Sequence, residues 1–460
     1  MGISDLVFFP LYLILFSLMF RIVRNRFDDP VLKKYHRRGF WVKVVASIAF
    51  CLFSIYMSPG DSVNLYQAES NHLYHLILQD PRRLGWVFQN GDLFNETFLK
   101  NYLNQGYFRS ESNFMIIRFV TLLSFITGGS YWAISLIFSC FAFTGIWKLY
   151  LFFYRQYPHL HKQFAVAILF FPSLTFWSSG IMKDPVCIAA LGWFTYGLYG
   201  LLYLRKKLFR NLLLVALFGY LLAVIKIYIL ISYVPFFILF IVLKNLQRIK
   251  STFMKYALTP LFLLASIFAF TRVLNSYDQE LGGYAVQGLA GSIEKLNDAY
   301  ESMEGDATAE SNFSLGVDFD GTPAGFVRLA PAAIFATFFR PLPWEAHKIS
   351  QFIACIESLA LFLFTVFVLI KCGPIRFFRI IFSEAIISYC LLFSLVFAVF
   401  VGASTLNFGT LVRYKIPCLP FYTISMFLIY EKAKIISRNK KLQREKNNPA
   451  EGLALVPAVG

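Results

Sequence analysis

Long apolar runs with few charged residues follow one another along almost the whole chain, from Leu6–Phe20 to the run before the basic C-terminus. A helix needs roughly 20 mainly apolar residues to cross the hydrocarbon core of a membrane, which is about 30 Å thick. Hydrophobic residues make up 57% of the 460 residues and charged residues 15%, against about 45–50% and 25% in an average soluble domain. The runs therefore predict an all-α, polytopic transmembrane helical bundle and argue against a soluble enzyme or a fibrous protein.

The runs predict a single integral-membrane domain over residues 1–430, followed by a basic cytoplasmic tail over residues 431–460. About eleven spans are expected, near residues 5–21, 41–58, 131–149, 164–179, 186–204, 211–226, 227–243, 256–272, 351–371, 380–401 and 414–430. Residues 211–243 are also compatible with one long helix kinked around Lys226.

The distribution of charge predicts which side of the membrane each loop faces. The chain carries 43 Lys and Arg against 26 Asp and Glu, a net charge of +17, and cytoplasmic loops are usually richer in Lys and Arg. Basic clusters such as Arg205–Lys207 are therefore assigned to the cytoplasm, and two large loops, about 59–130 and 272–350, to the extracytoplasmic side. The N-terminus is then outside and the C-terminus cytoplasmic, and the net charge needs no nucleic-acid partner. The apolar stretch Asn113–Ile126 is expected to lie in the outer interface.

Charged residues gather at the outer ends of the predicted spans. Asp61 follows a Pro–Gly turn after the second span, and Glu69 lies about two helical turns farther along the chain. Lys183 and Asp184 occupy a short link between two spans, at the expected membrane edge. Five cations come from outer elements: Arg118, Lys183, Arg340, and Arg413 and Lys415 together at the start of the last predicted span.

These residues suit transfer of a sugar from a lipid-linked phosphate or diphosphate. Arg binds phosphate oxygens through a bidentate fork and Lys as a point charge, so the five cations are candidate phosphate ligands. A carboxylate can take a proton from the acceptor hydroxyl, which makes Asp61 and Glu69 the candidate catalytic residues. The candidate contacts to the sugar or the acceptor are Asp184, Trp344 and Glu345.

Structural roles compete with each of these assignments. Asp61 could cap a helix, Lys183 could pair with Asp184 at a turn, and the arginines could anchor helices at lipid headgroups. The seven Cys residues lie in or beside apolar runs and form no zinc pattern. His72 and His75 lack an evident third ligand, so no metal site is predicted.

Several short stretches resemble a group of bacterial multi-span proteins. They are Phe170–Leu174, Trp177–Gly180, Lys183–Asp184, Arg340–Glu345, Asn407–Gly409 and Leu411–Pro417. Proteins of this group are usually described as similar to GT-C glycosyltransferases, which use lipid-phosphate sugars, or to surface-polysaccharide polymerases. The resemblance implies a GT-C-like fold in the bacterial cytoplasmic (inner) membrane. It also implies a polyprenyl-phosphate-linked sugar or glycan as donor and a glycan or protein as acceptor.

In GT-C enzymes an acidic residue of the first large outer loop serves as base or metal ligand, and Asp61 occupies the matching position. The loop here follows the second span and has no adjacent acidic pair. A divalent metal cofactor is therefore compatible with the resemblance but not required by the sequence.

Three functions are left open. The first is a glycosyltransferase of cell-surface polysaccharide or glycoconjugate synthesis, in contact with membrane lipid. The second is an O-antigen or exopolysaccharide polymerase that binds a diphosphate through Arg. The third is a lipid-linked glycan transporter or flippase without catalysis, which should place ionisable groups along a path through the membrane. The candidates for such a path in the predicted spans are Glu357, Glu384 and Lys226, which are few, so transport is the least favoured of the three.

Overall fold

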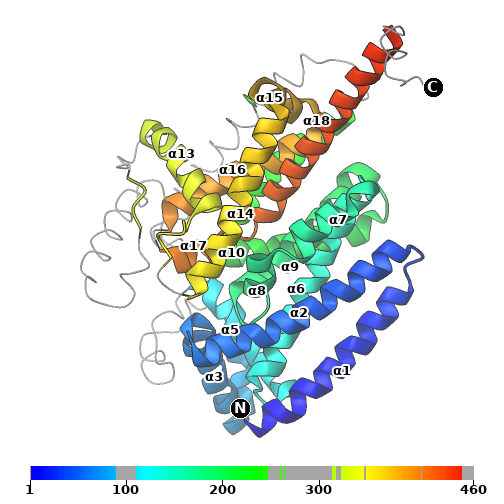
Figure 1. Cartoon of the computed structure of the whole chain (residues 1–460). Helices are drawn as coiled ribbons and strands as arrows, with labels where there is room; N and C mark the ends of the chain where they lie inside the picture. The colour runs from blue at the N-terminus through cyan, green and yellow to red at the C-terminus, as the bar shows by residue number, and fades with distance from the viewer. Residues whose placement is uncertain are drawn as a thin grey trace, which may run out of the picture.

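The structure, a computed structural model, describes residues 2–89, 110–246, 260–261, 264, 313–316, 323–346, 349–405 and 407–447. Every regular element in these ranges is helical, which confirms the all-α prediction. The helices lie side by side in a bundle whose N-terminus and C-terminal helix α18 are at opposite ends (Figure 1).

Seven helices of the described residues are long and apolar enough to cross a membrane. They are α1 Ile3–Asn25, α2 Pro30–Tyr56, α6 Tyr131–Tyr154, α9 Lys183–Tyr199 with its π-helical extension η7 Gly200–Leu204, α10 Leu208–Leu246, α14 Ile349–Cys372 and α16 Ala385–Ser404. This agrees with a polytopic membrane protein, with fewer such helices than the eleven predicted spans. The predicted span at 256–272 lies almost wholly outside the described residues.

The remaining helices lie between or beside these seven. They are η1 Ser62–Gln67, α3 Ala68–Gln79, η2 Pro81–Phe88, α5 Glu111–Thr127, η5 Pro158–Leu160, α7 His161–Phe164, η6 Ala165–Leu169, α8 Pro172–Trp177, α13 Pro323–Phe339, α15 Pro374–Ser383, α17 Phe408–Tyr414 and α18 Leu419–Asn447. The apolar stretch at 113–126 forms most of α5, and the predicted tail is helical as far as Asn447.

The element α10 is a helical hairpin that turns at Lys226, where the backbone is non-helical (φ −149°, ψ 74°). Before the turn, Phe218 stacks on Trp193 in the middle of α9, and Lys226 then reaches the first turn of α9. After the turn, Phe240 stacks on Tyr199 at the far end of α9. The two segments on either side of Lys226 therefore run in opposite directions along the same helix, with Lys226 at the tip.

The predicted span at 164–179 is not a continuous helix. It divides into α7, the π-helical η6 and the short α8, which begins at Pro172. Proline lacks a backbone N–H and disfavours helical geometry in the residue before it, so the helix is interrupted there. The link that follows, residues 178–182, is buried rather than exposed at a membrane edge.

Helices α6 and α9 approach each other at two glycines. A Cβ atom on Gly145 would lie 2.2 Å from the carbonyl oxygen of Ala189, and one on Gly192 would lie 1.9 Å from the carbonyl oxygen of Gly145. Only glycine fits at such distances, and small residues are the usual device for close helix packing in membranes. This contact fixes α9, whose first turn carries Lys183 and Asp184, against the centre of the bundle.

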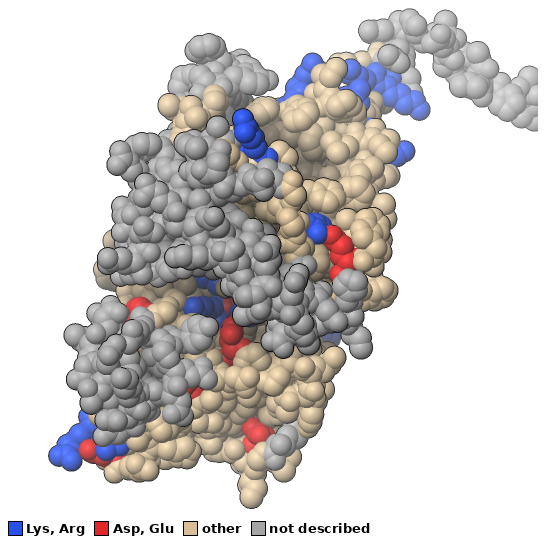
Figure 2. Space-filling view, turned by 90° about the vertical axis from the view of Figure 1, so that its left-hand side faces the viewer, with Lys and Arg blue, Asp and Glu red and all other residues tan. Residues whose placement is uncertain are grey.

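The bundle has two ends with different charge. We call them the Asp61 end, which contains Asp61, Lys183, Lys226 and Arg413, and the Arg205 end, which contains Arg205–Arg210. The 22 residues from Lys183 to Leu204 separate these ends, or about 33 Å at the rise of an α-helix. Figure 2 shows basic and acidic atoms side by side near the middle of one face, and basic atoms alone where the C-terminal helix leaves the bundle.

Candidate functional site

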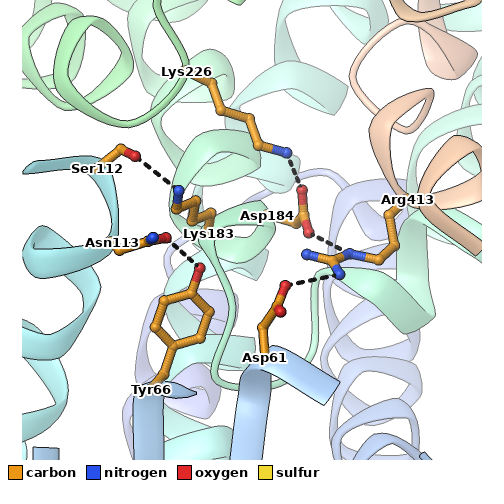
Figure 3. A network of polar contacts seen from close by, with 8 residues as sticks. All are labelled: Asp61, Tyr66, Ser112, Asn113, Lys183, Asp184, Lys226 and Arg413. Atoms are coloured by element: carbon orange, nitrogen blue, oxygen red, sulfur yellow. Dashed lines mark hydrogen bonds and ion pairs between the residues drawn. The ribbon is translucent and has the colours of Figure 1, made fainter. Parts of the chain in front are cut away.

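Asp184 joins three elements that are distant in sequence. It lies in the first turn of α9 and is 1% exposed. Its Oδ1 accepts a hydrogen bond from Lys226 Nζ at 2.5 Å, and its Oδ2 accepts one from Arg413 Nε of α17 at 3.4 Å (Figure 3). The helix dipole favours a carboxylate in a first turn, and the two cations compensate for the burial of its charge.

Arg413 connects this buried group to the surface. Its Nη1 donates to Asp61 Oδ2 at 3.2 Å, and the Asp61 side chain is 50% exposed. Burial alone would lower the pKa of Arg413, but the nearby carboxylates of Asp184 and Asp61 outweigh burial and raise it. Arg413 therefore stays charged and holds Asp61 in place.

Lys183 lies beside this cluster and is partly exposed. Its Nζ donates to Ser112 Oγ at 2.8 Å, and next to Ser112 the Oδ1 of Asn113 accepts a hydrogen bond from Tyr66 at 3.1 Å (Figure 3). Among the described residues, no carboxylate lies within 4 Å of the Lys183 ammonium. Tyr66, Ser112 and Asn113 are not among the site residues predicted from the sequence, because ordinary polar residues in a long loop carry no distinguishing pattern.

The candidates Arg340, Glu345 and Lys415 form a separate, adjacent group. Arg340 Nε donates to both carboxylate oxygens of Glu345, at 2.8 and 3.1 Å, so its charge is already neutralised. Lys415 is 1% exposed and donates to the carbonyl oxygen of Arg340 at 3.2 Å and to Ser358 Oγ at 3.0 Å. Trp344 is 74% exposed. These contacts hold the turn after α13 against α14.

Arg118 is also neutralised by a carboxylate. Its guanidinium pairs with Glu111 of the same helix and donates to the carbonyl oxygens of Val87, at 2.8 Å, and Gln89, at 2.5 Å. These bonds tie η2 to α5. The structure thus brings Asp61, Lys183, Asp184 and Arg413 together, and it gives Arg118 a structural role in the described part of the chain.

Glu69 differs from Asp61 in its environment. It is 4% exposed, and no hydrogen bond or ion pair to its carboxylate is found among the described residues. Burial raises its pKa to about 6. The intervening η1 is π-helical, so the α-helical spacing that relates Glu69 to Asp61 in the sequence does not hold between them.

This burial predicts a pH-dependent stability difference between the natural chain and Glu69→Gln. A carboxyl with a raised pKa binds more protons folded than unfolded, so its contribution to stability is lost as the pH rises from about 4.5 to about 6. We expect Glu69→Gln to gain stability relative to the natural chain over this range. Thermal unfolding of both purified proteins at pH 4.5 and pH 8 measures the difference, and an equal difference at both pH values would refute the assignment.

Two further observations bear on the site as a whole. Among the described residues, no group of three His, Cys, Asp or Glu side chains is placed to hold a metal ion. Comparison with protein-family models, curated proteins and solved structures gives no match.

Two charged residues that the sequence left unassigned, the partly buried Glu357 and the buried Lys43, hold the helix α8 that precedes the site. Glu357 of α14 accepts hydrogen bonds from the backbone N–H of Ser173, at 2.7 Å, and from its hydroxyl, at 2.6 Å, at the N-terminus of α8. Lys43 of α2 donates to the carbonyl oxygens of Thr175, at 3.2 Å, and Ser178, at 2.5 Å, at its C-terminus. Each charge opposes the partial charge of the helix end that it contacts. The sequence does not single out Lys43, because a lysine near the start of an apolar run resembles the cations that commonly flank a membrane span.

Proposed function

We propose that the protein transfers a sugar or glycan from a polyprenyl phosphate or diphosphate at the Asp61 end of the bundle. One observation carries the proposal: a half-exposed carboxylate, Asp61, is fixed by a guanidinium beside an ammonium group, Lys183, that has no carboxylate partner among the described residues. The proposed setting is the extracytoplasmic face of a bacterial inner membrane, in surface-polysaccharide or glycoconjugate synthesis, and the proposed fold is GT-C-like.

Each residue of the cluster has a distinct proposed role. Lys183 binds a phosphate oxygen of the donor, since it is the cation of the cluster that has no carboxylate partner among the described residues. Asp61 accepts the proton of the acceptor hydroxyl as the bond between the sugar and the phosphate breaks. Arg413 positions Asp61, and the buried Asp184 and Lys226 position Arg413 and the start of α9.

The location of the cluster also suits a lipid-linked donor. Lys183 begins a helix that is long and apolar enough to span the membrane. A polyprenyl chain would remain in the bilayer while its phosphate reaches the helix ends. A water-soluble nucleotide sugar would not need a site at this depth.

The test measures donor dependence in Lys183→Gln. Vesicles containing the protein are supplied with radiolabelled polyprenyl-linked glycans extracted from a bacterium that makes surface polysaccharide. Loss of a charged hydrogen bond is expected to cost about 1.5–3 kcal/mol, so half-maximal transfer should require at least about tenfold more donor. Lys162→Gln, an exposed lysine near the start of α7, is the matched control and should behave as the natural chain. Unchanged donor dependence in Lys183→Gln would reject the phosphate-binding role.

A transporter of lipid-linked glycans is the second candidate. It is favoured by the interrupted helix at 161–182 and by the turn at Lys226, because broken helices with charged residues are common at transport sites. The same vesicles separate the two functions. Transfer breaks the bond between glycan and lipid phosphate, whereas transport moves the labelled lipid to the other leaflet with this bond intact.

A further inference from the structure

A cavity of about 320 Å³ lies between α1 and α2, away from the proposed catalytic cluster. Three arginines line it, Arg21 and Arg24 from α1 and Arg37 from α2, together with the rings of Phe20, His36 and Trp41. It lies toward the Arg205 end, since His36 packs on Trp147 in the second half of α6.

The cavity is charged and contains no acid. No Asp or Glu lines it, and in the described part of the chain none of the three guanidiniums forms an ion pair. Arg24 donates a hydrogen bond to the neutral side chain of Asn25, at 3.3 Å. Three like charges around one space repel one another, and a phosphate, which guanidinium groups bind through paired hydrogen bonds, would offset that repulsion.

The surroundings of the cavity are apolar. Leu18 and Trp41 are 54% and 49% exposed, on helices long and apolar enough to cross a membrane. Helix α1 has a single buried residue among those described, Phe20, so much of its length is open to hydrocarbon. Phe20 packs on Phe40 of α2 with ring centroids 4.9 Å apart.

We propose that this cavity binds an anionic membrane lipid, with the lipid phosphate against Arg21, Arg24 and Arg37 and an acyl chain along the exposed apolar side of α1. Basic pockets between membrane helices are known to suit anionic headgroups, and a Trp at such a depth fits the membrane interface. The lipid adds a further link between α1 and α2 beside the contacts of Phe20 with His36 and Phe40. This binding is independent of the sugar-transfer proposal.

Binding is tested on the delipidated full-length protein in detergent, by native mass spectrometry. The probes are dioleoyl phosphatidylglycerol, dioleoyl phosphatidylcholine and inorganic phosphate. Each nearby Lys or Arg is worth about 1 kcal/mol toward an anionic lipid, so Arg21→Gln/Arg24→Gln/Arg37→Gln should weaken phosphatidylglycerol binding by at least about tenfold. The matched control, Arg205→Gln/Lys206→Gln/Arg210→Gln, removes the same charge elsewhere at that end and should change binding by less than about threefold.

Each contrary result overturns the proposal. Equal loss in the control triple variant would show nonspecific attraction, and binding of inorganic phosphate as tight as that of the lipid would show a free-anion site. A second measurement avoids any risk that the triple variant misfolds. Phosphatidylglycerol with brominated acyl chains should quench the tryptophan fluorescence of the natural chain more than brominated phosphatidylcholine does, and Trp41→Phe should abolish this difference. A difference that persists in Trp41→Phe rejects the cavity as the site.

Discussion

Asp61→Asn is expected to lower sugar transfer by about 100- to 10,000-fold, the usual contribution of a general base. The amide keeps the shape of the carboxylate and its ability to accept a hydrogen bond from Arg413, but it cannot take a proton at neutral pH. Folding should be normal, because the Asp61 side chain is half-exposed and exposed ion pairs contribute roughly 0–1 kcal/mol. The measurement is glycan product and residual lipid-linked donor in vesicles that contain equal amounts of protein.

Asp80→Asn is the matched control for this change. Asp80 is also an acid of the first large loop, caps η2 through the backbone N–H of Arg82 at 3.2 Å, and pairs with that arginine. Its replacement should leave transfer within about twofold of the natural rate if only Asp61 acts as a base. Near-normal product from a well-folded Asp61→Asn would exclude the base and favour a polymerase that relies on Arg, or a transporter.

Asp184→Asn is expected to destabilise the protein by about 3–5 kcal/mol, because it leaves the buried Lys226 ammonium without its counter-charge. The Lys226 side chain is 5% exposed and that of Asp184 is 1% exposed, so water cannot compensate. The free energy of unfolding of the purified protein in mixed micelles, with increasing SDS, measures the loss. Asp61→Asn removes the other carboxylate of Arg413 and serves as the control, with an expected loss below about 1 kcal/mol.

The double variant Asp184→Asn/Lys226→Gln removes both buried charges and distinguishes two causes of this loss. If the cost comes from an uncompensated charge, the double variant should recover more than half of it. A double variant as unstable as Asp184→Asn would instead show that the packing or the hydrogen bond of Asp184 is what matters.

The sequence predicted the class of fold because it depends on long apolar runs, and hydrocarbon requires such runs to be helical. It also predicted Asp61, Lys183, Asp184 and Arg413 as site candidates, since charged residues beside apolar helices are few. The structure adds their meeting at the first turn of α9, which depends on the reversal of α10 at Lys226 and on the direction of α17. Neither is a property of any local stretch of residues.

The interruption of the predicted span at 164–179 shows a second limit of prediction from the sequence. Hydropathy averages over a window, so it reports that the segment is apolar and not that Pro172 ends one helical segment and begins another. Hydropathy likewise does not report which carboxylate each cation pairs with. Arg118 and Arg340 each pair with a carboxylate close along the chain, Glu111 and Glu345. Arg413 instead pairs with two carboxylates far from it in the sequence, Asp61 and Asp184.

Glu357 and Lys43 hold the two ends of α8, and this arrangement has a consequence for how the donor specificity of the protein can evolve. The short link at 178–182 transmits the position of α8 to Lys183, so the placement of the proposed phosphate ligand depends on two residues that never meet the substrate. Selection for a different donor can therefore act on residues deep in the bundle that shift α8, without replacing Lys183. Residues on α2 and α14 then belong with the cluster itself as targets for altering specificity.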